Sequence, residues 1–383
     1  MLLKVCFFSP TAYSYFDKSK NLWAGGAEIQ QVLVAREMAA RGIEVSFIVG
    51  DYGQDDVEVF GDITVIKSFA PFKGNRKLRF ILDMLKIYRA MKIADADVYN
   101  QRSTSFYTGQ LAYFAARLKK KFTFSIGIDY NCLSDCGGFL PKIMCRLYRY
   151  GIRKADAVIA QTEQQKKLLR ENFDVEATLI RNGIYIPTGT SHDDALDKVE
   201  NALQGKEKTR EFLWVGSFRK RKRPELFVEL ARRIPEARFT LIGGVGDDKD
   251  YYEKIVKDAE KVENLRYVGF VPPERIDSYY RKAFALINTS YLEGFPNTYL
   301  HSWIYGTPTL TIEIDPDGII EREGIGRKTG SFEELVRSAR ELCSDENLRN
   351  HMSQRAWNYV RKNHDIKDRS QDYIELFERL IAE

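Results

Sequence analysis

Long apolar runs are missing from this sequence of 383 residues. No stretch approaches the roughly 18 to 20 apolar residues that a membrane-spanning helix needs. The beginning of the chain, MLLKVCFFSP, runs directly into a strand-like segment and contains no small-residue cleavage site of the kind that ends a signal peptide. These two absences argue against a membrane-spanning or secreted protein, and we expect a cytoplasmic one.

Cysteine is also scarce, with five in the chain. The spacing of Cys132, Cys136 and Cys145 matches no zinc-binding pattern, and no histidine lies near them. Scattered cysteines in a large intracellular protein are typically reduced thiols rather than a disulfide framework. We therefore expect five reduced thiols and no cysteine-bound metal.

The overall composition is that of a globular protein, with 44% hydrophobic and 30% charged residues. A chain of this length exceeds what one hydrophobic core usually organises, so two domains are expected. Neither a disordered protein nor a membrane-spanning one fits these proportions.

Charge is unevenly distributed along the chain. Residues 1–187 carry 27 Lys and Arg against 19 Asp and Glu (net +8), whereas residues 188–383 carry 32 against 35 (net −3). The excess is concentrated in residues 73–92 and 142–154, which have the pattern of basic amphipathic helices. Such helices suit an anionic membrane surface, and ordinary helices with a solvated basic face explain the pattern equally well. No nucleic-acid recognition motif accompanies them, so we expect no nucleic-acid partner.

Short β-rich segments alternate with helix-period segments along the whole chain, which is typical of parallel sheets covered by helices. In the first half the expected strands are residues 4–9, 44–49, 63–66, 97–100, 122–126, 157–160 and 177–180. In the second half they are residues 212–216, 238–243, 265–269, 284–288 and 308–312. Two complete series predict two Rossmann-like domains, residues 1–187 and 188–367, with a hinge near 183–190. The final helix, 368–383, either ends the second domain or braces the first.

Ligands of open parallel sheets bind beyond the carboxyl ends of the strands, where glycine-rich turns expose main-chain N–H groups. In the first domain, Gly25 and Gly26 precede a helix and mark a loop at the expected cleft. In the second, Gly216 and Ser217 follow a strand, and five cationic residues occupy 219–223. Cations at a strand end favour a diphosphate site over a merely solvated charge run.

A third turn of this kind combines two parts of the second domain. Gly243 and Gly244 follow one expected strand, and Phe270 and Val271 follow the next. Main-chain N–H and C=O groups there are expected to read a nucleotide base. The nearby aspartates at 247, 248 and 250 are interpreted as a helix-start cluster rather than a metal site, because carboxylates favour helix N-termini.

The fourth segment, residues 288–312, carries the most weight. Glu293 lies in a loop after a strand, where its carboxylate is placed to accept hydrogen bonds from sugar hydroxyls. A helix opens at Pro296, and its free N–H groups at 297–299 complement a diphosphate. Asn297 and His301 share the helix face opposite the buried stripe, although a histidine satisfied by its helix neighbours remains an alternative. The expected donor-binding residues here are Glu293, Gly294, Phe295, Pro296, Asn297, Thr298 and His301.

Together these segments resemble the retaining glycosyltransferases of family four. The likeness is carried by GGAEIQQVLVAREMAARG (25–42), LWVGSFRKRKRPELFVELARRIPEARFTLIGG (213–244), EGFPNTYLHSWIYGTPTL (293–310) and WNYVRKNHD (357–365). It implies an α/β fold of the GT-B type, in which two facing Rossmann-like domains enclose a deep cleft. It further implies that Glu293 contacts donor hydroxyls near the reacting carbon and that Lys222 neutralises the donor diphosphate.

The chain departs from the family pattern at three positions. His301 replaces the second glutamate of the Glu-x7-Glu element, which is expected to hold the ribose. Ser217 stands where many members have another diphosphate-binding arginine, for which Arg219 or Arg221 can substitute. Many members also have an N-domain histidine near the acceptor, and Asp129 is the nearest polar candidate here.

The resemblance implies an enzyme that moves a sugar from a nucleoside-diphosphate sugar to a hydroxyl acceptor with retention of configuration. The acceptor is expected to be a glycan or lipid-linked molecule of cell-surface polysaccharide biosynthesis, which would place the protein on the inner face of the membrane. No metal ligand set is evident in the sequence, so we expect no metal and no cofactor beyond the sugar nucleotide. A nucleotide-sugar epimerase, a phosphorylase or a non-catalytic binding member remains the alternative.

Overall fold

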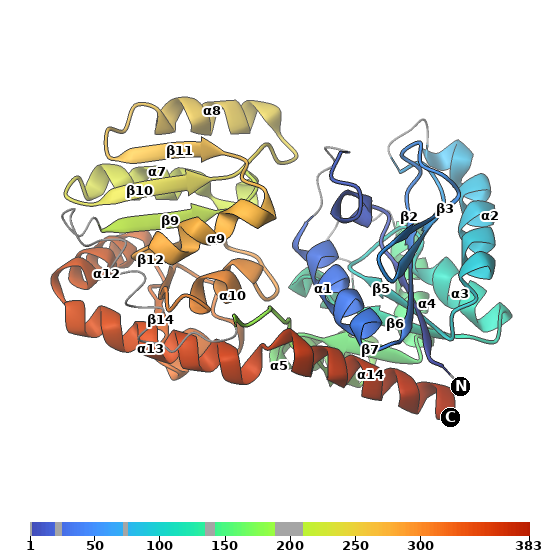
Figure 1. Ribbon diagram of the computed structural model, residues 1–383. Coiled ribbons are helices and arrows are strands. Elements are labelled where there is room, and N and C mark those ends of the chain that lie inside the picture. Colours follow the sequence, from blue (N-terminus) through green and yellow to red (C-terminus); the bar gives the residue numbers. More distant parts are fainter. Residues whose placement is uncertain (1, 20–24, 72–75, 135–141, 188–209) are drawn as a thin grey trace. The chain divides into compact units, whose positions relative to one another are not determined.

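A computed structural model (Figure 1) describes the whole chain except residues 1, 20–24, 72–75, 135–141 and 188–209. The chain divides into two compact units, Met1–Tyr185 with Ile366–Glu383, and Ile186–Asp365. We call these the N-unit and the C-unit. The division lies close to the expected boundary at residue 187, and residues 188–190 of the expected hinge lie outside the described residues.

The N-unit contains an eight-stranded sheet in the order β3-β4-β2-β1-β5-β6-β7-β8, parallel except where β3 pairs with β4. Its strands are β1 Lys4–Phe8, β2 Glu44–Val49, β3 Val57–Phe60, β4 Ile63–Lys67, β5 Val98–Arg102, β6 Lys121–Ser125, β7 Ala157–Ala160 and β8 Ala177–Leu179. Its helices are α1 Gly26–Ala40, α2 Arg76–Ala94, α3 Thr108–Arg117, α4 Lys142–Lys154, α5 Glu163–Phe173 and α14 Ile366–Ala382, with 3₁₀ turns η1 Ala12–Tyr15 and η2 Asp129–Cys132.

Helices cover both faces of this sheet, as β1 illustrates. Val5 and Phe7 face a core shared with α1 and α14, whereas Cys6 and Phe8 face a core shared with α2, α3, α4 and α5. Alternate residues of a strand point to opposite faces, so a strand buried on both faces reads as a continuous apolar run. This burial explains why the central strands were recognisable from sequence.

The last helix, α14, packs on the N-unit. Tyr373, Phe377 and Leu380 enter the core that also contains Val32 and Met38 of α1. The main chain of Ile366 also donates a hydrogen bond to that of Ile184 (3.0 Å). Of the two expected places for the tail, the structure shows the one that braces the first domain, and it begins at Ile366 rather than at residue 368.

The C-unit has a six-stranded parallel sheet in the order β11-β10-β9-β12-β13-β14. Its strands are β9 Glu211–Val215, β10 Arg238–Ile242, β11 Leu265–Gly269, β12 Ala285–Asn288, β13 Thr309–Thr311 and β14 Gly326–Lys328. Its helices are α7 Pro224–Arg233, α8 Lys249–Ala259, α9 Pro273–Lys282, α10 Asn297–Trp303, α11 Ile319–Arg322, α12 Phe332–Ser344 and α13 Glu346–Asn363, with 3₁₀ turns η4 Lys220–Lys222 and η5 Pro316–Gly318. Each expected strand of both series appears within two residues of its predicted ends, and β3 and β14 were not expected.

The cysteines differ in state. Cys6, Cys132 and Cys343 are buried free thiols, and burial raises the pKa of the Cys6 thiol to about 12. Cys145, in contrast, is in a disulfide. The expectation of five reduced thiols is therefore wrong for Cys145, because sequence spacing does not report which sulfurs the fold brings together, and Cys136 lies outside the described residues.

Candidate donor-binding site

Two loops at the carboxyl edge of the C-unit sheet approach each other through glycine. The main-chain N–H of Gly216, after β9, donates to the Ile242 carbonyl at the end of β10 (3.0 Å). A Cβ added to Gly243 would overlap the carbonyl oxygen of Gly216 and approach the Phe218 ring to 2.9 Å. Only glycine fits position 243, so the expected glycine turns lie side by side.

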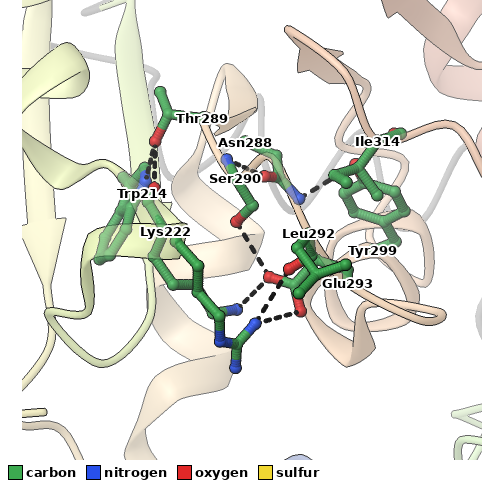
Figure 2. Close-up of polar contacts among 10 residues, drawn as sticks. Trp214, Lys222, Asn288, Thr289, Ser290, Leu292, Glu293, Tyr299 and Ile314 are labelled. Carbon is green, nitrogen blue, oxygen red and sulfur yellow. Dashed lines mark hydrogen bonds and ion pairs between the residues drawn. The ribbon is translucent and has the colours of Figure 1, made fainter. Parts of the chain in front are cut away.

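A hydrogen-bonded chain ties the turn after β9 to the loop after β12 (Figure 2). Thr289 Oγ1 accepts a hydrogen bond from the buried indole of Trp214 (2.9 Å) and donates one to the main-chain oxygen of Lys222 (2.7 Å). Asn288, the last residue of β12, accepts from the N–H of Ser290 (2.8 Å) and donates to the Tyr299 hydroxyl of α10 (3.1 Å). The loop that carries Glu293 is therefore held at both of its ends.

The Glu293 carboxylate lies between two cations of the η4 turn. Its Oε1 is 2.5 Å from Lys222 Nζ and accepts from the Ser290 hydroxyl at 2.9 Å, and its Oε2 is 3.2 Å from Arg221 Nη1. Arg221 also donates to the main-chain oxygen of Leu292 (3.0 Å). Figure 2 shows Lys222 and Ser290 converging on this carboxylate. The structure thus brings together Glu293 and Lys222, two of the residues expected from sequence to contact the donor.

Glu293 is only 8% exposed, so it is a buried carboxylate in a loop. Burial alone raises the pKa of a carboxyl group. Here the charges of Lys222 and Arg221, with hydrogen bonds from Lys222 and Ser290, outweigh burial and hold the pKa of Glu293 below its usual value. The carboxylate stays ionised at neutral pH and keeps its capacity to accept hydrogen bonds.

Two other cations of residues 219–223, Lys220 and Arg223, form ion pairs with different carboxylates. Lys220 pairs with Asp248 (3.2 Å), and Asp248 also caps α8 by accepting from the N–H of Tyr251 (2.9 Å), as expected for a helix-start carboxylate. Arg223 donates to the main-chain oxygen of Thr289 (2.6 Å) and pairs with Glu313 (2.8 Å). Lys220 and Arg223 thus have carboxylate partners outside the Glu293 loop, and a diphosphate role for the run 219–223 stays a prediction.

His301 lies on α10 and faces α9. Its ring stacks on that of Tyr280 with 5.4 Å between centroids, and its Nδ1 is 3.6 Å from Asp277 Oδ1. The stripe expected to be buried on this helix, Tyr299, Leu300, Trp303 and Ile304, is buried. Sequence spacing placed His301 off this stripe but did not indicate the aromatic partner from α9.

A pocket of about 490 Å³ lies where β11 passes into α9. Its lining includes Phe270, Val271, Arg275 and Tyr279. Phe270 is 62% exposed, an unusual state for a large apolar side chain, whereas Val271 is buried. A Cβ on Gly244 would stand 3.5 Å from Phe270 Cβ, so this expected glycine adjoins the turn that was predicted to read a base.

The remaining candidates belong to the N-unit. Asp129 begins η2 at the carboxyl edge of the sheet and accepts a hydrogen bond from Gln165 (2.9 Å). Gly25 is the N-cap of α1, Gly26 is the first residue of that helix, and the N–H of Gly25 donates to Glu28 (2.9 Å). These two glycines therefore begin a helix as expected.

Two kinds of feature are absent from the described residues. No group of three or more His, Cys, Asp or Glu side chains is arranged to hold a metal ion there. In the same part of the chain, no helix combines the length and apolar character needed to cross a membrane.

Two family models match the sequence over adjoining ranges. Glycosyltransferase Family 4 matches residues 24–186, and Glycosyl transferases group 1 matches residues 180–359. The chain belongs to the group 1 glycosyltransferases. This group 1 glycosyltransferase is 24% identical over 323 residues to alpha-monoglucosyldiacylglycerol synthase of Acholeplasma laidlawii, with 78% of this chain and 80% of that protein covered.

Solved structures show the fold of this glycosyltransferase. Sucrose-phosphate synthase from Thermosynechococcus elongatus has a TM-score of 0.79 at 17% identity, with 99% of both chains covered. Anabaena HepE, solved in complex with UDP-glucose, has a TM-score of 0.74 at 14% identity, with 98% of this chain and 100% of HepE covered. The expected GT-B fold class is confirmed.

Proposed function

We propose that this glycosyltransferase moves a sugar from a nucleoside-diphosphate sugar to a hydroxyl acceptor with retention of anomeric configuration. The observation that carries the proposal is the buried carboxylate of Glu293, held by Lys222 and Arg221 where the turn after β9 meets the loop after β12. Carboxyl ends of neighbouring parallel strands are where ligands bind in such sheets. Anabaena HepE, a protein of the same fold, was solved with UDP-glucose, which supports a sugar nucleotide as the ligand.

Lys222 and Arg219 are proposed to bind the donor diphosphate, together with the first N–H groups of α10. An ammonium has three donors, so Lys222 keeps donors for a phosphate while one contacts Glu293. Cations fixed in place stabilise the negative charge that develops as the nucleoside diphosphate leaves. We propose that this is done without a metal ion, and that the acceptor hydroxyl attacks from the face that the diphosphate leaves.

Other parts of the donor are assigned to neighbouring residues. Glu293 is proposed to accept hydrogen bonds from sugar hydroxyls, and Asp129 to act on the acceptor side. The pocket beside Phe270 and Val271 is proposed to take the base, because an exposed aromatic ring offers a stacking surface. His301 is proposed to bond the ribose, since its ring is already fixed by stacking on Tyr280.

The acceptor is proposed to be a glycan or lipid-linked molecule of cell-surface glycan biosynthesis at the inner face of a membrane. The helix α2 carries Ile81, Leu82 and Leu85 at 68%, 58% and 61% exposure, beside the exposed cations Lys86 and Arg89. Exposed apolar residues among cations are typical of helices that lie on anionic membranes. Lys142 and Ile143 of α4 are also exposed, which adds a second basic helix to this proposal.

A thermal-shift screen against UDP, GDP, ADP and their sugars tests the donor proposal. A ligand that binds only the folded protein raises its melting temperature. We expect one nucleoside diphosphate and its sugar to raise the Tm of the wild type and of Glu341→Gln, whose carboxylate pairs with Arg327 elsewhere in the C-unit. Lys222→Ala should lose most of the increment. No shift with any nucleotide, or an equal shift in Lys222→Ala, would contradict the site.

A further inference from the structure

Arg102 lies where the strand order of the N-unit sheet reverses. It is the last residue of β5, which lies beside β1, and the chain proceeds from β1 to β2 on one side and later to β5 on the other. Such a switch point leaves a crevice beyond the strand ends, where ligands of parallel sheets bind. Polar side chains mark this end of the sheet: Asn100 of β5 donates to Thr123 (2.9 Å) and Ser125 (3.1 Å) of β6.

The guanidinium of Arg102 has few acceptors. Its Nη2 donates to the side-chain oxygen of Asn182 (2.6 Å), a neutral amide, while its Nε is buried without a hydrogen-bond partner. A guanidinium offers five N–H donors and carries a fixed positive charge. Burial lowers the pKa of Arg102, against the opposing charges of Tyr373 and Glu28. A buried donor without an acceptor is costly, so such a group indicates an absent partner.

No carboxylate of the described residues forms an ion pair with Arg102. Glu28, whose charge acts on it, has both oxygens engaged elsewhere: Oε1 accepts from Thr11 (2.8 Å) and Oε2 from the N–H of Gly25 (2.9 Å). Two other arginines of the same unit have carboxylate partners, since Arg41 pairs with Glu37 (3.2 Å) and Arg369 with Asp372 (3.0 Å). Arg102 differs from these two arginines because it is buried at the strand end and no carboxylate of the described residues pairs with it.

We propose that Arg102 binds an oxyanion, a phosphate or a carboxylate, carried by the acceptor. A guanidinium presents two parallel N–H groups to either oxyanion, which gives both strength and orientation. The inference rests on the proposed function only in assigning the anion to the acceptor rather than to another ligand. It makes the acceptor of this enzyme a negatively charged molecule and places its charge at the β1/β5 end of the N-unit.

A structural role for Arg102 is the competing explanation. Asn182 lies in the segment that leads out of the N-unit. The side chain of Gln30 holds the next residue, Gly183, by accepting a hydrogen bond from the Gly183 N–H and donating one to the Gly183 carbonyl oxygen, both at 2.9 Å. The bond between Arg102 and Asn182 adds to this anchorage. A purely structural arginine affects stability equally with and without an anion, so the two explanations differ in anion dependence.

The experiment measures the Tm of the full-length protein, with UDP present at saturation so that the proposed donor site is occupied. Potassium phosphate and potassium acetate are titrated separately against potassium chloride of equal ionic strength. The variant is Arg102→Gln, and the matched control is Arg117→Gln, which removes an exposed arginine at the end of α3. Phosphate and acetate distinguish a phosphorylated acceptor from a carboxylated one.

We expect phosphate or acetate to raise the Tm of the wild type and of Arg117→Gln by about 2 °C at tenfold its dissociation constant. Arg102→Gln should show no increment. Equal anion-induced Tm increments in both variants would overturn the proposal, and so would no increment in the wild type with either anion. A lower Tm of Arg102→Gln that keeps the full anion increment would also overturn it.

If Arg102→Gln does not fold, Arg102→Lys takes its place. Loss of the paired N–H geometry should weaken anion binding about tenfold, and unchanged binding would overturn the proposal.

Failure of the Arg102 proposal and failure of the donor-site proposal give different results in this experiment. Absence of any Tm increase with UDP would count against the donor site and not against Arg102, because the proposed donor residues are in the C-unit and Arg102 is in the N-unit. The anion titration would still be readable without UDP in a Lys222→Ala background, where the donor cation is removed. A phosphate increment that disappears with Lys222→Ala and persists in Arg102→Gln would assign the anion to the donor site and reject the Arg102 site.

Discussion

Lys222 Nζ and Glu293 Oε1 are 2.5 Å apart, and this ion pair links the turn after β9 to the loop after β12. Arg221 adds a second cation to the same carboxylate at 3.2 Å. Two positive charges and one negative charge leave a local net charge of +1 at the carboxyl edge of the sheet. A site with this balance suits a donor that brings a diphosphate.

Removing either member of the pair should strongly slow sugar transfer. We expect Glu293→Gln and Lys222→Ala each to lower the turnover of folded enzyme by about 100-fold or more, because each removes charge placed at the leaving group or at the sugar. Glu293→Gln should also cost about 3 kcal/mol of unfolding free energy, since it leaves two partly buried cations without their carboxylate.

Nucleoside-diphosphate release, measured per folded molecule, and urea unfolding give the two quantities separately. Glu341→Gln is the control, because it removes an ion-paired carboxylate from the surface of the same unit. If the folded Glu293→Gln protein were as active as Glu341→Gln, the carboxylate would have a structural role only.

Gly243 should be irreplaceable, whereas its neighbour should not. In Gly243→Ala the added methyl group overlaps the carbonyl oxygen of Gly216, so main chain must move, and we expect a loss of about 3 kcal/mol. In Gly244→Ala the methyl group meets only Phe270 Cβ at an ordinary 3.5 Å, and the loss should stay below about 1 kcal/mol. Urea unfolding of both variants checks this, and equal stabilities would show that the two turns have room to separate.

The exposed apolar residues of α2 should contribute to membrane binding. We expect the double variant Leu82→Ser and Leu85→Ser to lower affinity for anionic liposomes about tenfold, because two side chains no longer enter the interface. Val59→Ser is the control, since Val59 is 68% exposed on β3. Sedimentation with liposomes measures the effect, and transfer to a soluble acceptor should not change. Wild-type protein that stays in the supernatant would remove the membrane proposal.

Transfer should proceed without divalent cations. The cations Lys222 and Arg219 are proposed to take the role that a metal has in other transferases, so activity in EDTA should equal that in buffer alone. Initial rates with EDTA, magnesium and manganese decide the point. A loss of activity in EDTA that only manganese or magnesium restores would require a metal site.

The two strands that sequence analysis missed have physical explanations. β14 has the sequence Gly326-Arg327-Lys328, without the apolar pattern by which strands are recognised, and it pairs with β13 through its main chain. A Cβ at Gly326 would overlap the carbonyl oxygen of Thr309, so the close approach of the strands itself selects glycine. β3 is short and half exposed, and its pairing with β4 is antiparallel, outside the alternating βα pattern.

The site shows a similar division. The motifs predicted Glu293, because it follows a strand that ends at the ligand edge of a parallel sheet. They also predicted the cationic run 219–223, within which the family resemblance singled out Lys222. They did not predict Ser290 as a partner of Glu293, nor that Arg223 is engaged by Glu313. A run of cations has no internal periodicity that tells which of its members turn toward a neighbouring strand.

The sequence by itself determined the two series of strands, the helices between them and the glycine turns, because burial on both faces and tight turns leave local patterns of residue type. Only the tertiary structure decided which charges meet and that the last helix returns to the N-unit. It also decided that no carboxylate in the described part of the chain pairs with Arg102. These outcomes depend on contacts between residues far apart in the chain, and the energy of a charge is set by the groups that fold around it.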